Sequence, residues 1–212
     1  MKKDTYEMIL KTIQKKAQLV VVSKYRSLEE LLFYYEQGQR MFGENRVQEL
    51  VAKYDALPKD IEWHMIGHLQ SNKVKYIAPF IRLIHSVHAK SLLDEIDKQV
   101  YKHNRIISVC IQFNLAKEEN KSGFQEAEWQ EVMQYATSLS NVMVEGIMVM
   151  GPHTDDKQAI EQVFQKAQSL FEIMQKKYPT IRILSMGMSH DYELALKYKA
   201  NLLRVGSILF ES

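Results

Sequence analysis

The chain carries the run Leu19-Val20-Val21-Val22-Ser23-Lys24 near its start. A short apolar stretch rich in valine is typical of a strand that is covered on both faces, as in a parallel sheet flanked by helices. The lysine that closes this strand would have its stem among apolar neighbours. Burial disfavours an ammonium group, so such a lysine is suited to attack a carbonyl as a free amine and form a Schiff base. The alternative is that Lys24 extends from the strand end into water.

Strand-like and helix-like segments alternate along the rest of the chain. The expected strands are 19–23, 41–43, 62–66, 83–87, 106–113, 143–149, 182–184 and 202–205. The expected helices are 6–16, 28–36, 47–54, 71–77, 90–101, 126–139, 157–177 and 191–198. Eight strands alternating with helices, without linkers or repeats, predict an α/β fold that forms a single (β/α)8 TIM barrel over residues 1–212. A doubly wound open sheet is the alternative.

The composition excludes several classes of protein. The 28 Lys and Arg residues against 26 Asp and Glu give no electrostatic reason to expect a nucleic acid or a membrane surface as partner. The one cysteine, Cys110, lies in an apolar strand and excludes an intramolecular disulfide, which suits a reducing compartment. The chain has neither a signal peptide at its start nor an apolar run of membrane-spanning length. We therefore expect a cytoplasmic protein and, from the charged outer helices, a monomer.

Polar residues gather where the expected strands end, which is where barrels of this kind carry their active groups. Lys24 closes the first strand, Glu44 and Asn45 follow the second, and Asn114 follows the fifth. Glu44 could pair with Lys24 or cap a helix. His64, within the third strand, could act as a base or a ligand, but a hydrogen-bonded interior histidine is the commoner role. The histidines show no metal-binding spacing such as HExxH, so we expect no metal site.

The segments after the seventh and eighth strands have the features of a phosphate site, which barrels commonly build there. Ser189 is predicted to be the N-cap of the next helix, where free N–H groups favour an anion. Gly206 would let the backbone approach a ligand closely, and Ser207 would add a hydroxyl group. An ordinary N-cap and an ordinary turn glycine are the alternatives. Arg204, on a buried strand, needs an acceptor, either a structural carboxylate or a ligand atom at the barrel mouth.

Several long motifs occur in order along the chain. They include VSK at 22–24, FGENRVQE at 42–49, WHMIGHLQSNK at 63–73, KSG at 121–123, LSMGMSHD at 184–191 and RVGSILF at 204–210. Together they resemble the pyridoxal phosphate homeostasis proteins, also called the YggS or PROSC family. The resemblance covers almost the whole chain, and it implies the barrel of the alanine racemase N-terminal domain.

The resemblance also implies a cofactor, pyridoxal 5′-phosphate, held as an internal aldimine on Lys24. The cofactor-binding residues that it implies are Lys24, Asn45, His64, Ser189, Arg204, Gly206 and Ser207. Among these, Ser189, Gly206 and Ser207 match phosphate-binding positions, and Arg204 matches the arginine that faces the pyridine nitrogen. A permanent donor at that nitrogen leaves it unprotonated, so the ring is a weaker electron sink. This arrangement suits a carrier better than a versatile enzyme.

The function that the resemblance implies is intracellular vitamin B6 homeostasis. The protein would hold and buffer pyridoxal phosphate and supply it to enzymes that depend on it, without catalysis of its own. The chain ends shortly after the eighth strand, so we expect no second domain that could bring a racemase its tyrosine base. A narrow pyridoxal phosphate enzyme, such as a weak amino-acid racemase, would need His64 or a tyrosine as proton donor. A cofactor-free aldolase using Lys24 would leave the arginine and phosphate motifs without a purpose.

The end of the chain departs from the family pattern. It reads Phe210-Glu211-Ser212, whereas a glycine and a basic residue usually follow this phenylalanine. We expect the departure to affect the packing of the tail and to leave Lys24, Ser189 and Arg204 in place.

Overall fold

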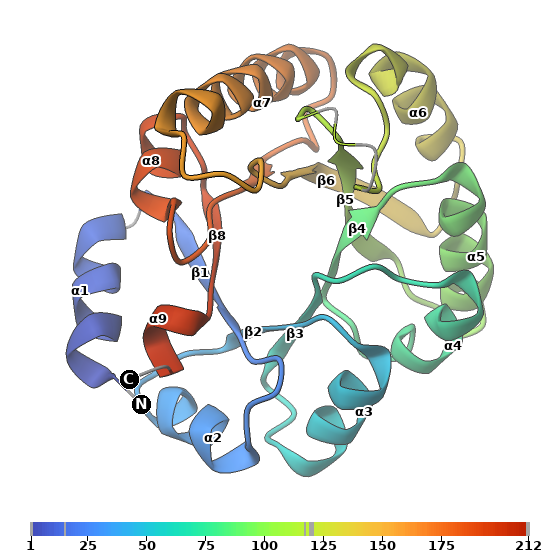
Figure 1. Cartoon of the computed structure of the whole chain (residues 1–212). Helices are drawn as coiled ribbons and strands as arrows, with labels where there is room; N and C mark the ends of the chain where they lie inside the picture. The colour runs from blue at the N-terminus through green and yellow to red at the C-terminus, as the bar shows by residue number, and fades with distance from the viewer. Residues whose placement is uncertain (1, 15, 117, 119–120, 211–212) are drawn as a thin grey trace.

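Eight parallel strands form a closed barrel (Figure 1). The computed structural model describes residues 2–14, 16–116, 118 and 121–210. The strands are β1 (Gln18–Val22), β2 (Met41–Glu44), β3 (Glu62–Met65), β4 (Leu83–Val87), β5 (Ile107–Phe113), β6 (Val142–Val149), β7 (Ile183–Ser185) and β8 (Leu202–Val205). The last strand pairs with the first, with Gln18 opposite Leu202 and Val21 opposite Val205. This closure confirms the predicted barrel and excludes the open sheet.

Helices form a ring around the barrel (Figure 1). They are α1 (Lys3–Ile13), α2 (Leu28–Glu36), α3 (Val47–Ala56), η1 (Ser71–Lys73), α4 (Val74–Ile77), α5 (Lys90–Tyr101), η2 (Glu126–Glu128), α6 (Trp129–Ala136), α7 (Lys157–Lys177), α8 (Tyr192–Lys197) and α9 (Ser207–Phe210). The N-terminal helix begins and ends three residues earlier than predicted, because Gln14 adopts a left-handed conformation with φ 40°. The short α9 was not predicted.

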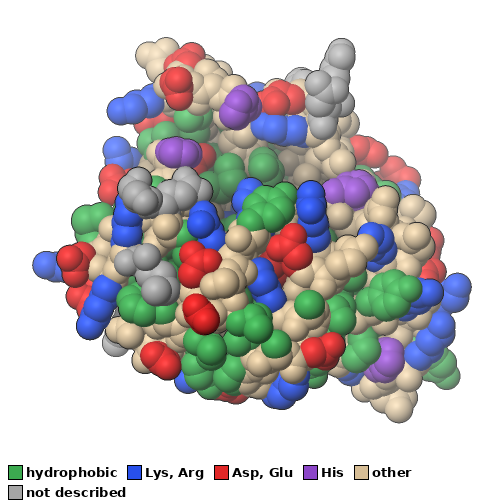
Figure 2. Space-filling view, turned by 60° about the horizontal axis from the view of Figure 1, so that its bottom comes forward, with side chains coloured by type: hydrophobic (Ala, Val, Ile, Leu, Met, Phe, Trp, Pro, Cys, Tyr) green, Lys and Arg blue, Asp and Glu red, His purple; other side chains and the backbone are tan. Residues whose placement is uncertain are grey.

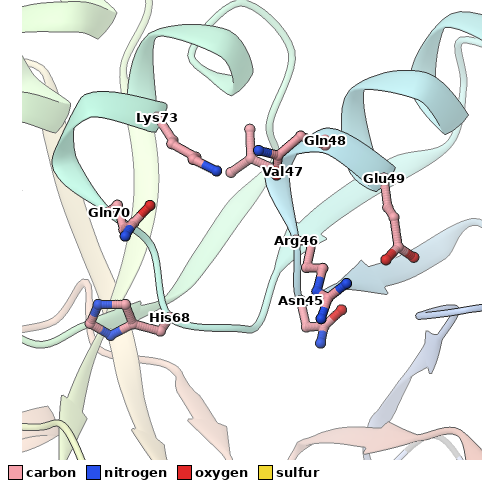
Figure 3. Close-up of a pocket in the computed structure, with 8 residues that line it drawn as sticks. All are labelled: Asn45, Arg46, Val47, Gln48, Glu49, His68, Gln70 and Lys73. Atoms are coloured by element: carbon pink, nitrogen blue, oxygen red, sulfur yellow. The ribbon is translucent and has the colours of Figure 1, made fainter.

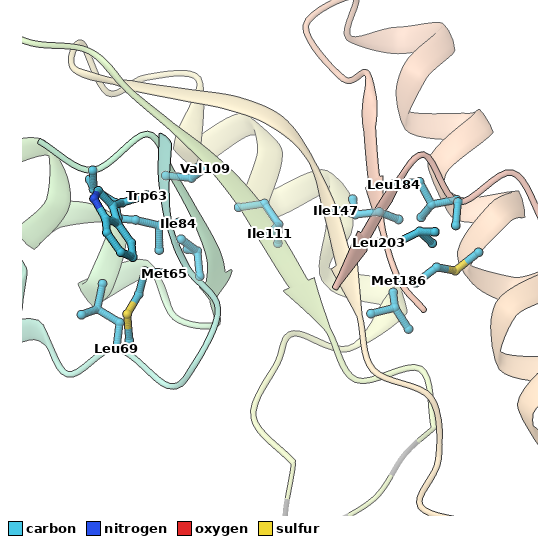
Figure 4. Packing of buried hydrophobic residues seen from close by; sticks show 14 of the residues in the cluster. Trp63, Met65, Leu69, Ile84, Val109, Ile111, Ile147, Leu184, Met186 and Leu203 are labelled. Carbon is cyan, nitrogen blue, oxygen red and sulfur yellow. The ribbon is translucent and has the colours of Figure 1, made fainter. Parts of the chain in front are cut away.

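The main apolar core lies between the barrel wall and the helices. Outward-facing side chains such as Trp63, Met65, Ile84, Ile111 and Leu203 belong to it (Figure 4). A smaller cluster fills part of the barrel interior and consists of Val20, Leu83, Cys110, Met148 and Leu202. Burial raises the pKa of the Cys110 thiol, so this cysteine is a packing residue and not a nucleophile.

Side chains alternate between the interior and the outer face along each strand. On β8, Leu202 belongs to the interior cluster and Leu203 to the outer core. The same alternation directs Arg204 inward. On β3, Trp63 and Met65 face outward, so His64 faces the interior. This alternation decides which polar residues of the chain can reach the middle of the barrel.

The two ends of the described chain meet on one side of the barrel (Figure 1). The backbone N–H of Lys2 and the hydroxyl of Tyr34 both donate to the carbonyl oxygen of Leu209, at 3.1 and 2.5 Å. The ring of Phe210 packs edge-on against Tyr34. These contacts anchor α9. Glu211 and Ser212, where the chain departs from the family pattern, lie outside the described residues.

The outer surface mixes charges of both signs. On the face shown in Figure 2, basic and acidic side chains are interspersed. None of the helices within the described ranges is long and apolar enough to cross a membrane.

Candidate functional site at the barrel mouth

A cavity of about 430 Å³ lies at the carboxyl ends of the strands. It is lined by Val22, Lys24, Tyr25, Arg26, Asn45, Ile66, Gly67, Met150, Met188, Ser189, His190, Arg204, Gly206 and Ser207. Six of the seven cofactor-binding residues that the resemblance implies are in this lining, and His64 is not. Barrel closure therefore brings the start and the end of the chain into one site.

Lys24 follows β1 and lies in a turn with an exposed side chain. The prediction of a lysine buried at a strand end is therefore wrong. The strand ends at Val22, and the chain then turns through Tyr25, whose φ of 62° is unusual for a residue other than glycine. Lys24 continues the series of every second residue, after Val20 and Val22, that faces the barrel interior, and it lines the cavity. Its amine can be reached from both the cavity and the solvent.

Arg204 lines the same cavity and is only 3% exposed. Its Nη1 donates to Ser185 Oγ at 2.6 Å and its Nη2 to the carbonyl oxygen of Val149 at 3.2 Å. Within the described part of the chain, no carboxylate lies at ion-pair distance from it, so the structural-carboxylate alternative finds no support. Burial lowers the pKa of Arg204 to about 10, which leaves the guanidinium charged at neutral pH. Two of its five N–H donors are used, and an acceptor in the cavity would satisfy more.

The loops after β7 and β8 are joined at the cavity. The backbone N–H of Gly206 donates to Ser189 Oγ at 3.2 Å, and Ser207 begins α9 beside it. A Cβ atom at position 206 would lie 3.0 Å from the Cβ of Val22. A larger residue at position 206 would therefore crowd Val22, which follows from the close approach of the loop after β8 to the end of β1. The hydroxyl groups of Ser189 and Ser207 thus form a polar part of the cavity lining, which also includes Lys24.

Ser189 is not a helix N-cap, contrary to the prediction. The α8 helix begins at Tyr192, and Asp191 occupies the N-cap position. The Asp191 Oδ1 atom accepts a hydrogen bond from the backbone N–H of Met188 at 2.6 Å. This bond closes a turn that holds Ser189 ahead of the helix, so its hydroxyl is available to the loop after β8.

Asn45 and Gly67 form another part of the lining. A Cβ atom at position 67 would lie 2.3 Å from the carbonyl oxygen of Asn45 and 2.6 Å from its Cα. Only glycine allows the loop after β3 to lie this close to the end of β2. The Asn45 Oδ1 atom is buried and has no hydrogen-bond partner within the described chain. The amide therefore has unused hydrogen-bonding capacity at the cavity wall.

Replacing Gly67 by alanine should push the two loops apart. Overpacking of this kind costs about 1–3 kcal/mol, and for a chain of this size each kcal/mol lowers the melting temperature by about 2–4 °C. We expect a lower melting temperature in thermal unfolding monitored by circular dichroism. An unchanged melting temperature would show that Asn45 can move aside at no cost.

Glu44, whose partner the sequence left open, pairs with Lys53 of α3 and not with Lys24. Lys53 Nζ lies 2.6 Å from Glu44 Oε1 and donates to the carbonyl oxygen of Ser23 at 2.7 Å. The Ser23 hydroxyl donates to the same Oε1 at 2.7 Å. Glu44 is fully buried, and burial raises its pKa against the opposing effects of Lys53 and Ser23. The pair fastens the ends of β1 and β2 to α3 next to Lys24.

Lys53 was missed at the sequence level, although a signal exists. It continues the buried stripe of Val47 and Leu50 on α3, where an apolar residue would be expected. A lysine in such a stripe needs a buried partner. Glu49, on the same helix, also supports the turn, because its Oε2 accepts from the backbone N–H of Tyr25 at 3.1 Å.

His64 lies below the cavity, inside the barrel, which corrects the expectation of a place at the mouth. Its Nδ1 is 2.9 Å from Nε2 of His85 on β4, and burial lowers its pKa to about 3. His64 and Ile66, which lines the cavity, are two positions apart, so their side chains point to the same side of the sheet. The His64 side chain therefore points into the barrel interior, as that of Ile66 does, but it lies deeper than the cavity.

A second cavity, of about 600 Å³, shares Asn45 with the mouth cavity. Its walls come from the start of α3 and from the loop after β3 (Figure 3). Arg46, Gln48 and Glu49 line one side, and His68, Gln70 and Lys73 line the other. It extends the polar surface of the site away from Lys24.

Comparison with known proteins decides the family. A sequence model described as "Alanine racemase, N-terminal domain" matches residues 3–212. The pyridoxal phosphate homeostasis protein of Aquifex aeolicus (strain VF5) is 40% identical to this chain over 196 residues, which cover 92% of this chain and 86% of the relative. The chain belongs to the pyridoxal phosphate homeostasis protein family. The family resemblance inferred from the motifs is thereby confirmed.

Solved structures of this family have the same barrel. PipY of Synechococcus elongatus PCC7942, in a structure with pyridoxal phosphate bound, matches with a TM-score of 0.87 and 32% identity, over 97% of each chain. The alanine racemase of Clostridium difficile 630 matches with a TM-score of 0.82 at 12% identity, over 97% of this chain and 55% of the racemase. At this identity the racemase likeness shows a shared fold alone.

Proposed function

We propose that this protein binds pyridoxal 5′-phosphate in the mouth cavity and holds it covalently through a Schiff base with Lys24 Nζ. The observation that carries the proposal is the buried guanidinium of Arg204, which has spare donors and no carboxylate partner among the described residues. An uncharged aromatic nitrogen is an acceptor that such a group can satisfy. The likeness to PipY, whose structure has pyridoxal phosphate bound, supports the same conclusion.

The residues of the cavity fit the chemical parts of this cofactor. Lys24 offers an accessible amine for the aldehyde. Ser189 and Ser207 offer hydroxyl groups of the kind that bind phosphate, and Gly206 lies between them in the lining with its N–H bonded to Ser189 Oγ. Asn45 has an unsatisfied amide oxygen at the wall. His64 is left out of the proposed contacts because it lies a layer below.

We further propose a carrier role: the protein buffers pyridoxal phosphate and supplies it, as a monomer, to enzymes that depend on it. The names of the relatives support homeostasis over catalysis. The bound cofactor would be attached to an exposed lysine, where water or an incoming amine can reach it. Arg204, a permanent donor, would keep the ring nitrogen unprotonated and weaken the cofactor as an electron sink.

A narrow racemase or lyase is less well supported. It would need a proton donor placed against the substrate. His64, one candidate, does not line the cavity, and Tyr25, which does, is 63% exposed. We expect no amino-acid racemisation above background when the cofactor-loaded protein is incubated with alanine and analysed by chiral chromatography. Turnover that is lost in Lys24→Ala would favour the enzyme instead.

The test of the proposed function is reduction with borohydride. The purified protein, mixed with pyridoxal phosphate, should show the absorption band of a Schiff base. Borohydride should bleach it, and peptide mapping should locate the reduced adduct on Lys24. No adduct after addition of excess cofactor would overturn the proposal.

Replacing Arg204 by leucine should weaken cofactor binding and alter its spectrum. The variant loses a charge-assisted hydrogen bond, worth about 1.5–3 kcal/mol, so we expect the dissociation constant to rise by about 10- to 100-fold. The absorption maximum of the bound cofactor should also shift, since its ring nitrogen loses a positive neighbour. An unaltered spectrum in a folded variant would count against the contact with the ring nitrogen.

A further inference from the structure

Four buried polar side chains form a continuous hydrogen-bonded chain across the barrel interior. Arg204 Nη1 lies 2.6 Å from Ser185 Oγ, which lies 2.8 Å from His85 Nδ1. His85 Nε2 in turn lies 2.9 Å from His64 Nδ1. All four residues are at most 3% exposed. The chain starts at the mouth cavity on β8 and crosses β7 and β4 to reach β3.

The directions of the bonds in this hydrogen-bonded chain are assigned outward from Arg204, the one member that can only donate. A guanidinium can only donate, so Ser185 Oγ is the acceptor in the first bond. The hydroxyl then has one proton to give, and His85 Nδ1 is its only other neighbour at hydrogen-bond distance in the described structure. We assign the hydroxyl proton to His85 Nδ1, because the opposite assignment would leave that buried proton without an acceptor. His85 then carries its own proton on Nε2, from which it donates to His64 Nδ1. His64 also carries its proton on Nε2, whose hydrogen-bonding capacity is unused within the described chain.

The chain of hydrogen bonds carries no charge besides that of Arg204. Burial lowers the pKa of His64 to about 3 and that of His85 well below its ordinary value, so both imidazoles are neutral at physiological pH. The nearby Arg82 and Arg204 act in the same direction. A carboxylate at position 185 would orient Arg204 equally well but would neutralise it. A hydroxyl backed by a neutral imidazole orients the guanidinium without adding a carboxylate at ion-pair distance.

We propose that Ser185 and His85 are positioning residues that aim the charged guanidinium of Arg204 at the ring nitrogen of the bound cofactor. The inference rests on the proposed function. The hydrogen-bonded chain is held rigidly at the end away from Arg204, because His64 and His85 belong to adjacent strands. Ser185 is the link that transmits this anchoring to Arg204, since it bonds to both His85 and the guanidinium.

The first test uses the ligand-free protein. Long-range ¹H–¹⁵N NMR spectra of the histidines should show His64 and His85 as neutral Nε2–H tautomers throughout pH 6–8. An Nδ1–H tautomer or an imidazolium at either residue would overturn the inferred direction of the chain. This measurement needs no cofactor, so its outcome is independent of the proposed function.

The second test uses Ser185→Ala with pyridoxal phosphate. We expect binding weaker by about 10- to 100-fold and an absorption maximum shifted in the same direction as in Arg204→Leu, whereas Ser185→Thr should restore both. Ser108→Ala is the matched control. It removes a buried hydroxyl of the same barrel that donates to Glu145 and does not belong to the chain of hydrogen bonds from Arg204 to His64. If the wild type binds and Ser185→Ala leaves spectrum and affinity unchanged, the positioning role is refuted. If the wild type fails to bind, the proposed function fails while the tautomer result stands.

Discussion

Lys24→Ala abolishes covalent binding of pyridoxal phosphate, by our expectation, and leaves the barrel intact. The wild type should yield close to one reduced adduct per chain after borohydride, and the variant should yield background labelling in intact-protein mass spectrometry. The reason is chemical, since alanine has no amine to condense with the aldehyde. The side chain is exposed, so the free energy of unfolding should change by no more than about 0.5 kcal/mol.

Lys121→Ala is the matched control for this loss. Lys121 lies in the loop after β5, and its Nζ donates to the carbonyl oxygen of Gly151 and to Glu118, both at 2.9 Å. An amine engaged in two such bonds should not compete for the aldehyde, so this variant should retain full labelling. Undiminished labelling of Lys24→Ala at another lysine would show that the anchor has been assigned to the wrong residue.

Lys53→Met should cause the largest loss of stability among single substitutions near the site. It leaves the fully buried carboxylate of Glu44 without its cation, and breaking a buried ion pair on one side costs about 3–5 kcal/mol. Urea unfolding at pH 7 should report this loss. Lys199→Met breaks an exposed pair with Glu172 of the same 2.6 Å length and should cost less than about 1 kcal/mol.

The loss in Lys53→Met should depend on pH in a definite direction. The folded-state pKa of Glu44 is raised above 4.5 by burial, so the folded protein holds this proton more tightly than the unfolded chain does. Stability from this group therefore falls as pH rises from about 4.5 through the folded-state pKa. Without Lys53 that pKa rises further, and the destabilisation should be greatest at neutral pH and shrink towards pH 4.5. Adding Glu44→Gln to Lys53→Met should recover part of the loss at pH 7. A loss equal to that of Lys199→Met at both pH values would contradict the role of the buried pair.

The site residues could be predicted to different extents, for physical reasons. Ser189 and Gly206 follow β7 and β8, and Arg204 lies within β8. These two strands are neighbours in a barrel of eight strands in chain order, so the joint position of the three residues at the mouth follows from topology. His64 is a hydrogen-bonded interior histidine, the role given above as the commoner one, and it does not line the cavity. The depth of a residue depends on the stagger of neighbouring strands, here His64 opposite Leu83, and this register appears only when the barrel closes.

Lys24 and Glu44 show a different limit. The local pattern predicted a strand that carried Lys24 at its buried end, but the left-handed turn at Tyr25 takes the lysine out of the sheet. Glu44 ends strand β2, and the alternating pattern of a strand does not indicate which residue will form an ion pair with it. Lys53 becomes that partner because α3 packs against β2 and β3, which places its amine beside Glu44 at the end of β2.

The sequence by itself determined the class of this protein: the number and order of its strands, the barrel, the family, and the group of residues from which a cofactor site can be built. These follow from periodicity and from ordered motifs, which are local properties of the chain. Only the tertiary structure decided the depth, the exposure and the partner of each polar side chain, including the chain of bonds from Arg204 to His64. Those properties depend on contacts between segments far apart in sequence, whose register and packing are set only when the whole barrel is closed.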